Sequence, residues 1–252
     1  MKAALAAGER QMGLWIAMAH ATSAEIAGKA GFDFCLIDGE HSPNDIPLIL
    51  DQVRAISMGS AQPAVRIPVF DPTLVKQVLD IGVQTILVPM IDTAEEAARV
   101  VASTRYAPAG FRGVGAAQAR ASNFGEITDM LTSANDQICV LVQCESVTSV
   151  KNIDAIAAVE GVDAVFIGPA DLSADMGLPG QITHPDVEAQ IRQAMDRINA
   201  AGKAVGIISF DPAKLQDYIG WGARFVAVGG DVSILARGIR QAAALAGDLK
   251  GN

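Results

Sequence analysis

Residues 161–177 read Gly161-Val-Asp-Ala-Val-Phe-Ile-Gly168-Pro169-Ala-Asp171-Leu-Ser-Ala-Asp-Met-Gly177. The apolar run at 164–167 has the length of a buried strand, and Gly168 and Pro169 bring it to an end. Asp171 follows at once, where a helix is expected to begin. This order predicts a strand that carries a carboxylate at its carboxyl end, which is the end at which parallel α/β folds bind ligands.

The same unit recurs along the chain. Upstream, the apolar run Gln137-Ile-Cys-Val-Leu-Val-Gln143-Cys144 is followed directly by Glu145. Eight apolar runs of strand length alternate with helical patterns, and we expect strands at residues 12–17, 34–37, 64–67, 85–88, 138–142, 164–167, 204–208 and 225–228. We expect helices at residues 44–57 (with Asn44 as N-cap), 72–79, 93–103, 148–158, 185–200, 212–219 and 232–246.

Near-continuous apolar strands separated by helices are typical of a parallel sheet covered on both faces. Eight such units in 252 residues predict an α/β fold, a closed (β/α)8 TIM barrel, as a single domain over residues 1–252. A doubly wound open sheet is the alternative. The longest irregular stretch, from Tyr106 to about Ala134, is either a functional or interfacial loop or a plain surface excursion.

The composition limits the possible partners. Half of the residues are hydrophobic but only 5% are aromatic, so Ala, Val, Ile and Leu are expected to fill the interior. A net charge of −9 disfavours nucleic acid and anionic membranes as partners. No apolar stretch reaches about 18 residues, and the first residues do not resemble a signal peptide. An odd number of cysteines in apolar runs (Cys35, Cys139 and Cys144) favours reduced thiols and a cytoplasmic protein.

Polar residues gather at the predicted carboxyl ends of the second, third, fifth and sixth strands. Glu145 and Asp171 supply hard oxygen ligands, which suit magnesium or manganese when water or substrate oxygens complete the coordination. Each of the two acids could instead simply stabilise the start of the following helix. Their occurrence on neighbouring strand ends favours the metal site.

Arg66 and His41 are candidates for the chemistry. Arg66 ends an otherwise apolar strand, so its guanidinium could hold a substrate carboxylate or stabilise an enolate oxygen. The alternative is a structural ion pair with Asp38 or Glu145. His41 lies three residues after Asp38, whose carboxylate could orient the imidazole as a general base, although a hydrogen-bonded loop histidine is equally compatible.

Other reaction classes lack their key residue. None of the seven lysines falls at a strand's carboxyl end, as a Schiff-base aldolase requires, and no Ser or Cys stands beside a suitable base. Gly229-Gly230 could bind phosphate at the start of the last helix, which leaves a phosphate-binding isomerase as a weaker alternative. A metal, an arginine and a base are the set that enolate chemistry beside a carbonyl needs.

These residues resemble a known family, the metal-dependent (class II) pyruvate aldolases of the HpcH/HpaI type. The matching segments are Met12-Gly-Leu-Trp15, Gly31-Phe-Asp-Phe34, Leu36-Ile-Asp38-Gly-Glu-His41-Ser-Pro-Asn-Asp45, Val65-Arg66, Leu87-Val-Pro-Met90, Arg105-Tyr106 to Arg112-Gly-Val-Gly115, Val140-Leu-Val-Gln143 and the Gly168–Gly177 run. Together they extend over almost the whole chain.

The resemblance implies a lyase that reversibly cleaves 4-hydroxy-2-oxo acids, such as 4-hydroxy-2-oxoheptanedioate, to pyruvate and an aldehyde such as succinic semialdehyde. It implies that Glu145 and Asp171 hold a divalent metal (Mg²⁺, Mn²⁺ or Co²⁺), with no organic cofactor, and that Arg66 neutralises the enolate oxygen. It further implies that His41, oriented by Asp38, activates a water. The remaining implied site residues are Gln143 beside the metal, the Gly168, Pro169, Ala170 and Asp171 backbone at the pyruvate carboxylate, Trp15 and Ile208 in the aldehyde pocket, and Asp80 in a neighbouring subunit's site.

The resemblance also implies a homo-oligomer, expected as a hexamer, in which Asp80 reaches a neighbouring subunit. The chain departs from the family pattern at Cys144 and Ser146, around the glutamate, and at Gln118 in the long loop. These departures leave the metal ligand in place and the aldehyde preference open. The alternatives are a sibling aldolase for 2-dehydro-3-deoxyglucarate, an acyl-CoA lyase, and a non-catalytic barrel that binds an oxo-acid.

Overall fold

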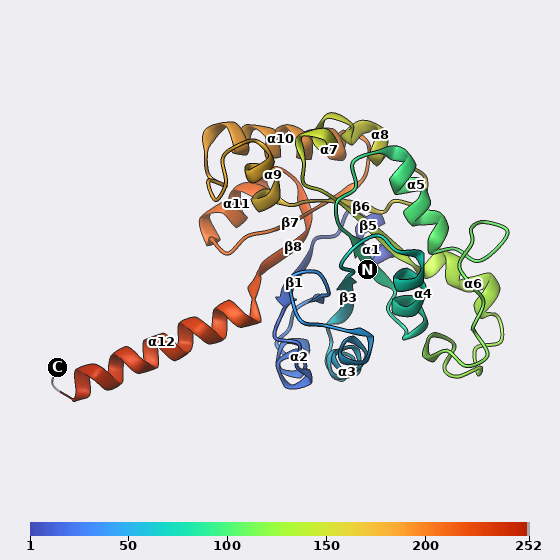
Figure 1. The fold of residues 1–252 in the computed structure, drawn as a ribbon, viewed down its shortest axis with the longest axis horizontal. Helices are drawn as coiled ribbons and strands as arrows, with labels where there is room; N and C mark the ends of the chain where they lie inside the picture. Colours follow the sequence, from blue (N-terminus) through green and yellow to red (C-terminus); the bar gives the residue numbers. More distant parts are fainter. Residues whose placement is uncertain (251–252) are drawn as a thin grey trace.

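Eight parallel strands close into a barrel in the computed structural model, which describes residues 1–250 (Figure 1). The strands are β1 (Gln11–Ile16), β2 (Phe34–Asp38), β3 (Gln62–Arg66), β4 (Thr85–Val88), β5 (Cys139–Cys144), β6 (Ala164–Ile167), β7 (Ala204–Ile208) and β8 (Ala223–Gly230). Each strand pairs with the next, and β8 pairs in parallel with β1. The predicted (β/α)8 barrel is confirmed, and the open sheet is excluded by the β1–β8 pairing. The last two residues of the predicted single domain, 251–252, lie outside the described residues.

Helices follow the strands, and most of them lie on the outer face of the barrel. They are α2 (Ala21–Gly28), α3 (Ile46–Ile56), α4 (Pro72–Asp80), α5 (Ala94–Ser103), α7 (Val147–Lys151), α8 (Ile153–Ala157), α9 (Pro169–Asp175), α10 (Pro185–Ala200), α11 (Pro212–Gly220) and α12 (Asp231–Leu249). Four of them (α3, α4, α10 and α11) have an N-cap side chain and a Pro at the first or second helical position, where Pro starts a helix without losing a hydrogen bond. Within residues 1–250, no helix is long and apolar enough to cross a membrane.

Several predicted element boundaries were wrong. Asn44 is not the cap of α3, because Asp45 caps it and accepts the Leu48 amide at 2.9 Å. The helix predicted at 148–158 is interrupted at Asn152 and forms α7 and α8. The long loop contains a 3-10 turn, η1 (Arg120–Ser122), and most of the helix α6 (Met130–Gln137).

The barrel interior is more aromatic than the composition suggested. Phe34, Phe166 and Phe225 are buried there, with the rings of Phe34 and Phe225 stacked at a centroid distance of 3.9 Å. Gly206 makes room for this packing, because a Cβ atom there would lie 2.6 Å from the Phe166 ring. The short helix α1 (Lys2–Ala6) adds Leu5 to the same interior cluster. Few aromatic residues are present, but three of them fill the centre.

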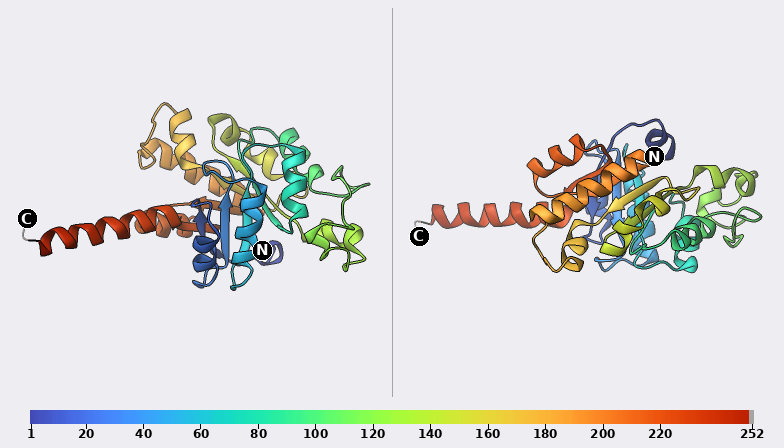
Figure 2. Two further views of the ribbon diagram at one scale, coloured as in Figure 1. Left: turned by 60° about the horizontal axis from the view of Figure 1, so that its bottom comes forward. Right: turned by 90° about the horizontal axis from the view of Figure 1, so that it is seen from above.

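The last helix leaves the barrel. In Figures 1 and 2, α12 projects from the end of β8 as a straight arm, while the other long helices lie against the sheet. Within α12 only Asp231 is buried. The predicted helix at 232–246 therefore exists, but it does not cover its own barrel.

Candidate active site

Arg66 and Asp38 form the centre of the site. They end β3 and β2, and they are paired residues in the register of these neighbouring strands. Asp38 accepts hydrogen bonds from Arg66 Nε at 2.9 Å and Nη2 at 2.7 Å, and from Trp15 Nε1 at 3.1 Å. Burial would raise the pKa of Asp38, but the hydrogen bonds and the charge of Arg66 outweigh it and lower the pKa below its usual value. Asp38 is thus held as a carboxylate, and it fixes the plane of the guanidinium.

Glu40 is the second partner of Arg66. Its Oε2 lies 2.8 Å from Arg66 Nη1, so the guanidinium is held by two acids. The ring centroid of Trp15 lies 4.9 Å from Arg66 Cζ. Burial raises the pKa of Glu40 against the opposing charge of Arg66, and the neighbouring carboxylates Asp38 and Asp171 add to the increase. The sequence pattern placed Glu40 at the end of the second strand but did not predict a role for it. Its position in the Asp38-Gly-Glu40-His41 segment, next to His41, was the only sequence signal for a role in the site.

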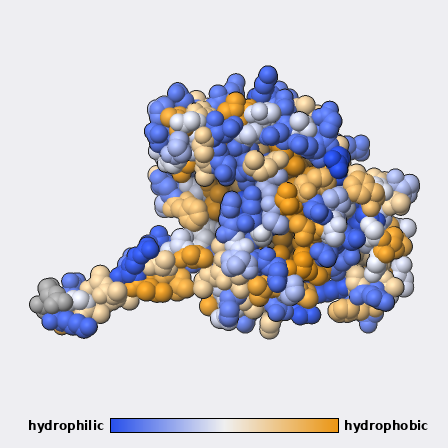
Figure 3. Space-filling view, in the orientation of Figure 1, coloured by the Kyte–Doolittle hydropathy of each residue, from blue (hydrophilic) through white to orange (hydrophobic). Residues whose placement is uncertain are grey.

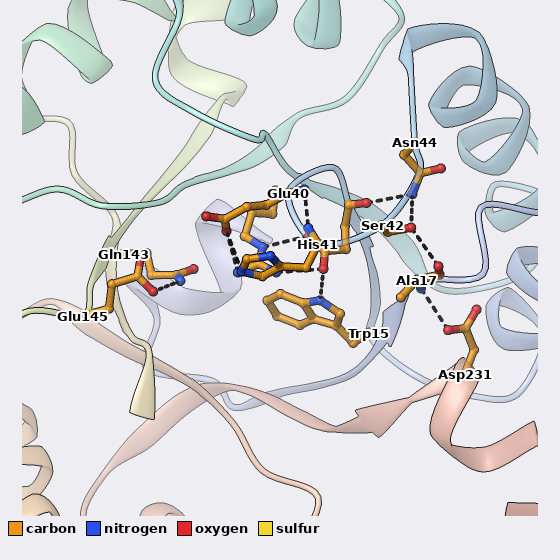
Figure 4. A network of polar contacts seen from close by, with 11 residues as sticks. Trp15, Ala17, Glu40, His41, Ser42, Asn44, Gln143, Glu145 and Asp231 are labelled. Carbon is orange, nitrogen blue, oxygen red and sulfur yellow. Dashed lines mark hydrogen bonds and ion pairs between the residues drawn. The ribbon is translucent and has the colours of Figure 1, made fainter. Parts of the chain in front are cut away.

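The predicted Asp38–His41 side-chain pair is not formed. The Asp38 carboxylate accepts the His41 backbone amide at 3.4 Å, but its oxygens are taken up by Arg66 and Trp15. The His41 imidazole is 66% exposed, and its Nε2 lies 4.0 Å from Glu40 Oε2. The alternative assignment of Asp38 as an ion-pair partner of Arg66 is the one that the geometry supports. His41 lies at the mouth beside Glu40 and Trp15 (Figure 4).

Glu145 and Gln143 face this group from β5 and the turn that follows it (Figure 4). Both are almost fully buried, at 3% and 2% exposed. Glu145 accepts the Met90 amide at 2.9 Å with one oxygen and the Gln143 side-chain amide with the other. Burial raises the pKa of Glu145 to about 7, although both of these hydrogen bonds act in the opposite direction. The Met90 amide was not anticipated, and the positive φ of 56° at Met90 directs the backbone there.

Gly168 leaves the space in which Glu145 lies. A Cβ atom at Gly168 would come within 2.5 Å of Glu145 Oε2 and 2.8 Å of Glu145 Cβ. Pro169 then begins α9, which leaves the amides of its first turn without carbonyl partners in the helix. Ala170 and Asp171 are exposed at this point, on the carboxyl side of β6.

The charges at the mouth do not balance. Asp38, Glu40, Glu145 and Asp171 are four acids, and the cation Arg66 forms ion pairs with two of them, Asp38 and Glu40. Burial is the main cause of the raised pKa of both Glu40 and Glu145, and the negative charge of Asp171 adds to the increase in each case. Gln143 Oε1 is buried and has no hydrogen-bond donor within the described structure.

These features fit a divalent cation. Two carboxylates and an unpartnered amide oxygen are hard donors, and a cation there would relieve the repulsion among the acids. Residues 1–250 hold no cluster of three His, Cys, Asp or Glu side chains suited to a metal. Further ligands would therefore come from Gln143, water or substrate oxygens, as expected for a site built from two acids.

Two apolar residues border the mouth. Trp15 is 7% exposed, and its ring centroid lies 5.7 Å from that of Phe166. Ile208, at the end of β7, is half-buried and packs on the same interior cluster. The structure therefore brings Trp15 and Ile208 to one apolar cluster below the polar groups.

Asp80 is not near these groups. It is the last residue of α4, which starts after the carboxyl end of β3 and runs back toward the opposite end of the barrel. Its Oδ1 lies 2.7 Å from Nη2 of the buried Arg112, in the long loop. A role for Asp80 in catalysis thus requires another subunit.

Comparisons with known proteins agree with this geometry. The family model HpcH/HpaI aldolase/citrate lyase matches residues 11–237. The chain is 52% identical to a hydroxypyruvate/pyruvate aldolase of Agrobacterium fabrum, over 95% of this chain and 90% of that protein. It is also 52% identical to a 4-hydroxy-2-oxo-heptane-1,7-dioate aldolase of Salmonella dublin, over 96% and 92%.

A solved structure of an HpcH/HpaI aldolase/citrate lyase family protein from Burkholderia cenocepacia superposes with a TM-score of 0.93. It is 41% identical, and the match covers 97% of this chain and 98% of that chain. The family predicted from the sequence motifs is confirmed, and the two relatives above, of Agrobacterium fabrum and Salmonella dublin, are named aldolases, which are lyases. The chain belongs to the HpcH/HpaI aldolase/citrate lyase family.

Proposed function

We propose that the chain is a metal-dependent aldolase that cleaves 4-hydroxy-2-oxo acids, such as 4-hydroxy-2-oxoheptanedioate, to pyruvate and an aldehyde. The observation that carries the proposal is the buried guanidinium of Arg66, held by Asp38 and Glu40, at the same mouth as Glu145 and Asp171. The similarity to relatives named as aldolases for this class of substrate supports it.

In this proposal Glu145 and Asp171 hold a divalent metal, with Gln143 beside them. When bound, the metal acts as a Lewis acid that favours negative charge on the oxygens of the oxo-acid. The backbone at Gly168–Asp171 binds the substrate carboxylate through the free amides at the start of α9. Mg²⁺, Mn²⁺ and Co²⁺ are all compatible with these oxygen donors.

Arg66 and His41 supply the remaining chemistry. The bond between C3 and C4 of the substrate breaks, its electron pair forms the pyruvate enolate, and Arg66 neutralises the enolate oxygen. His41 accepts the proton of the 4-hydroxyl group through a water, and the product aldehyde is released against Trp15 and Ile208. The enolate then takes a proton at C3 from water, which completes the methyl group of pyruvate, and the proton accepted by His41 returns to solvent.

We also propose a homo-oligomer, expected as a hexamer, in which Asp80 reaches the mouth of a neighbouring subunit. The ion pair with Arg112 supports this role, because it holds the Asp80 carboxylate in one orientation at the surface. A cytoplasmic location is part of the same proposal and is supported by three buried free cysteines.

The experiment is synthesis of the aldol from its two products. The purified chain is incubated with pyruvate, succinic semialdehyde and Mg²⁺, Mn²⁺ or Co²⁺, and the 4-hydroxy-2-oxo acid is quantified by mass spectrometry. We expect product with metal, none after treatment with a chelator, and recovery when metal is added back. Unchanged activity in chelator would exclude the metal, and loss of all exchange of the pyruvate methyl protons in deuterated water would favour a non-catalytic binding barrel.

A second candidate differs in the nucleophile. The relative named hydroxypyruvate/pyruvate aldolase is as similar to this chain as the relative named for the heptanedioate. Replacing pyruvate with hydroxypyruvate in the same assay distinguishes these two activities. Varying the aldehyde over a panel that includes tartronate semialdehyde tests for the 2-dehydro-3-deoxyglucarate aldolase. The pair with the highest kcat/KM identifies the preferred substrates.

A further inference from the structure

The turn that carries Glu145 is tied to the loop that follows β4. The strands β4 and β5 are neighbours paired in parallel, and contacts between their chains continue beyond the strand ends through residues 89–92. The Ile91 amide donates to the backbone oxygen of Gln143 at 3.0 Å, and the Met90 amide donates to the Glu145 carboxylate at 2.9 Å. Two successive residues of this loop thus hold the end of β5 and the side chain of Glu145.

Asp92 extends these contacts by one more residue. Its carboxylate accepts the hydroxyl of Ser146, the residue directly after Glu145. The backbone oxygen of Asp92 accepts the side-chain amide of Asn152 at 2.8 Å, and its amide donates to the Glu96 carboxylate at 2.8 Å. Asp92 therefore connects the start of α5 to both ends of α7, and its side chain binds the residue next to Glu145.

The Ser146 hydroxyl makes two hydrogen bonds at once. It donates to Asp92, and as the N-cap of α7 it accepts the Ser149 amide at 2.9 Å. Because α7 has only five residues, it has little helical stability of its own and depends on its contacts. A hydrogen bond to a charged acceptor is stronger than one between neutral groups. The bond to Asp92 is therefore a strong anchor for the turn in which Glu145 lies.

The outward side of the same loop is apolar. Met90 is 58% exposed and lines, with Val69 and Phe70, a depression of about 270 Å³. Figure 3 shows apolar (orange) surface near the centre of the barrel, beside α4 and α5 of Figure 1. Apolar contacts have no preferred direction, so the orientation of the loop is set by its hydrogen bonds to the turn after β5.

We propose that Asp92 is a positioning residue for the metal ligand Glu145 and that it acts through the Ser146 hydroxyl. The inference rests on the proposed function, in which Glu145 holds a divalent cation. Residues 1–250 hold no cluster of three His, Cys, Asp or Glu side chains suited to a metal, so Asp92 acts on the ligand and not on the cation itself. The Met90 amide orients the Glu145 carboxylate, while Asp92 fixes the backbone from which that side chain extends.

The test measures Mn²⁺ affinity by isothermal titration calorimetry on the full chain after removal of metal. Asp92→Ala and Ser146→Ala each remove the contact, whereas Asp92→Asn keeps an acceptor oxygen and Ser146→Thr keeps the hydroxyl. We expect the affinity to fall roughly 10–100-fold in the two alanine variants and to stay near wild type in the two conservative ones. In the aldolase assay the half-saturating Mn²⁺ concentration should rise by the same factor, by more than kcat falls.

A double variant and a matched control separate positioning from a loss of stability. If Asp92 acts through Ser146, the variant with both alanine substitutions should lower the affinity no further than either one alone. The control is Asp71→Ala, which removes the N-cap carboxylate of α4 in the loop after β3. It should lower the free energy of unfolding by about 1 kcal/mol and leave the Mn²⁺ affinity unchanged.

Glu145→Gln tests the metal site on its own. A wild-type chain that does not bind Mn²⁺, or a Glu145→Gln chain that binds it equally well, would overturn the proposed metal site and this inference with it. If Glu145→Gln loses affinity as expected, three results would overturn the role of Asp92 alone. These are wild-type affinity in Asp92→Ala, equal losses in Asp92→Ala and Asp92→Asn, and losses that multiply in the double variant.

Discussion

Asp38 and Arg66 are paired across β2 and β3, and two hydrogen bonds of 2.9 and 2.7 Å join their side chains where both are more than nine-tenths buried. The pair holds the guanidinium in one plane, while Glu40 occupies its remaining Nη1 atom. A buried ion pair of this kind adds little net stability, but removing one partner leaves the other charge uncompensated. The pair therefore serves to position Arg66.

Removal of this guanidinium should affect activity and stability together. Arg66→Ala leaves Asp38 and Glu40 without their cation, so we expect unfolding to become easier by about 3–5 kcal/mol. The loss of enolate stabilisation should lower kcat/KM by roughly 10²–10³-fold. Arg66→Lys keeps the charge but cannot form both bonds to Asp38, so it should recover stability more fully than activity.

The control for this prediction is Arg54→Ala. Arg54 pairs with Asp51 on the exposed face of α3, at 3.1 Å, and its loss should cost at most about 1 kcal/mol and leave kcat/KM unchanged. Activity is measured by coupling pyruvate release to lactate dehydrogenase, and stability by denaturant unfolding. Full activity in Arg66→Ala would contradict the proposed role.

His41 should show the opposite balance between stability and activity. Its imidazole is 66% exposed, so His41→Ala should leave the unfolding midpoint almost unchanged. As a general base it should contribute roughly 10²–10⁴-fold to kcat. His184→Asn, which keeps a capping side chain at the start of α10, is the matched control and should have wild-type activity. A His41→Ala enzyme with wild-type kcat would exclude the imidazole as the base.

Gly168→Ala should disrupt the site through a single methyl group. The added Cβ would lie 2.5 Å from Glu145 Oε2 and 2.8 Å from Glu145 Cβ, so the Glu145 side chain has to move. We expect metal affinity, measured by isothermal titration calorimetry, to fall by at least roughly tenfold. Gly220→Ala, in α11, meets no atom within 4 Å and should leave both affinity and activity intact. Equal metal affinity in both variants would disprove the assigned position of Glu145.

Stability of the metal-free protein should depend on pH through Glu145. Burial raises the pKa of this carboxyl from 4.5 to about 7, so the folded state binds its proton more tightly than the unfolded state does. The associated stability is fully present below about pH 4.5 and is lost as the pH rises through about 7, by up to about 3 kcal/mol. The difference in unfolding free energy between wild type and Glu145→Gln, both in chelator, should follow this trend from pH 5 to pH 8. A difference that is independent of pH would contradict the shifted pKa.

The sequence alone determined the architecture and most of the candidate site. The barrel was predictable because most strands are short apolar runs that end at Gly, Pro or a charged residue. Parallel strands buried on both faces also show a near-continuous apolar pattern that can be recognised locally in the sequence. Glu145 and Asp171 could be placed at one edge for the same reason, since the carboxyl ends of parallel strands meet there.

The pairing of side chains at that edge was decided by the tertiary structure. The loop spacing favoured a contact between Asp38 and His41, but the register of β2 and β3 places Asp38 directly beside Arg66, whose two N–H groups bind it instead. The Met90 amide reaches Glu145 because of a positive φ angle that no sequence pattern indicated. The pattern of residues 232–246 predicted a helix, but it could not show that the helix leaves its own barrel. That outcome follows from the absence of a loop after β8 and from the contacts of Asp231, which only the folded chain brings together.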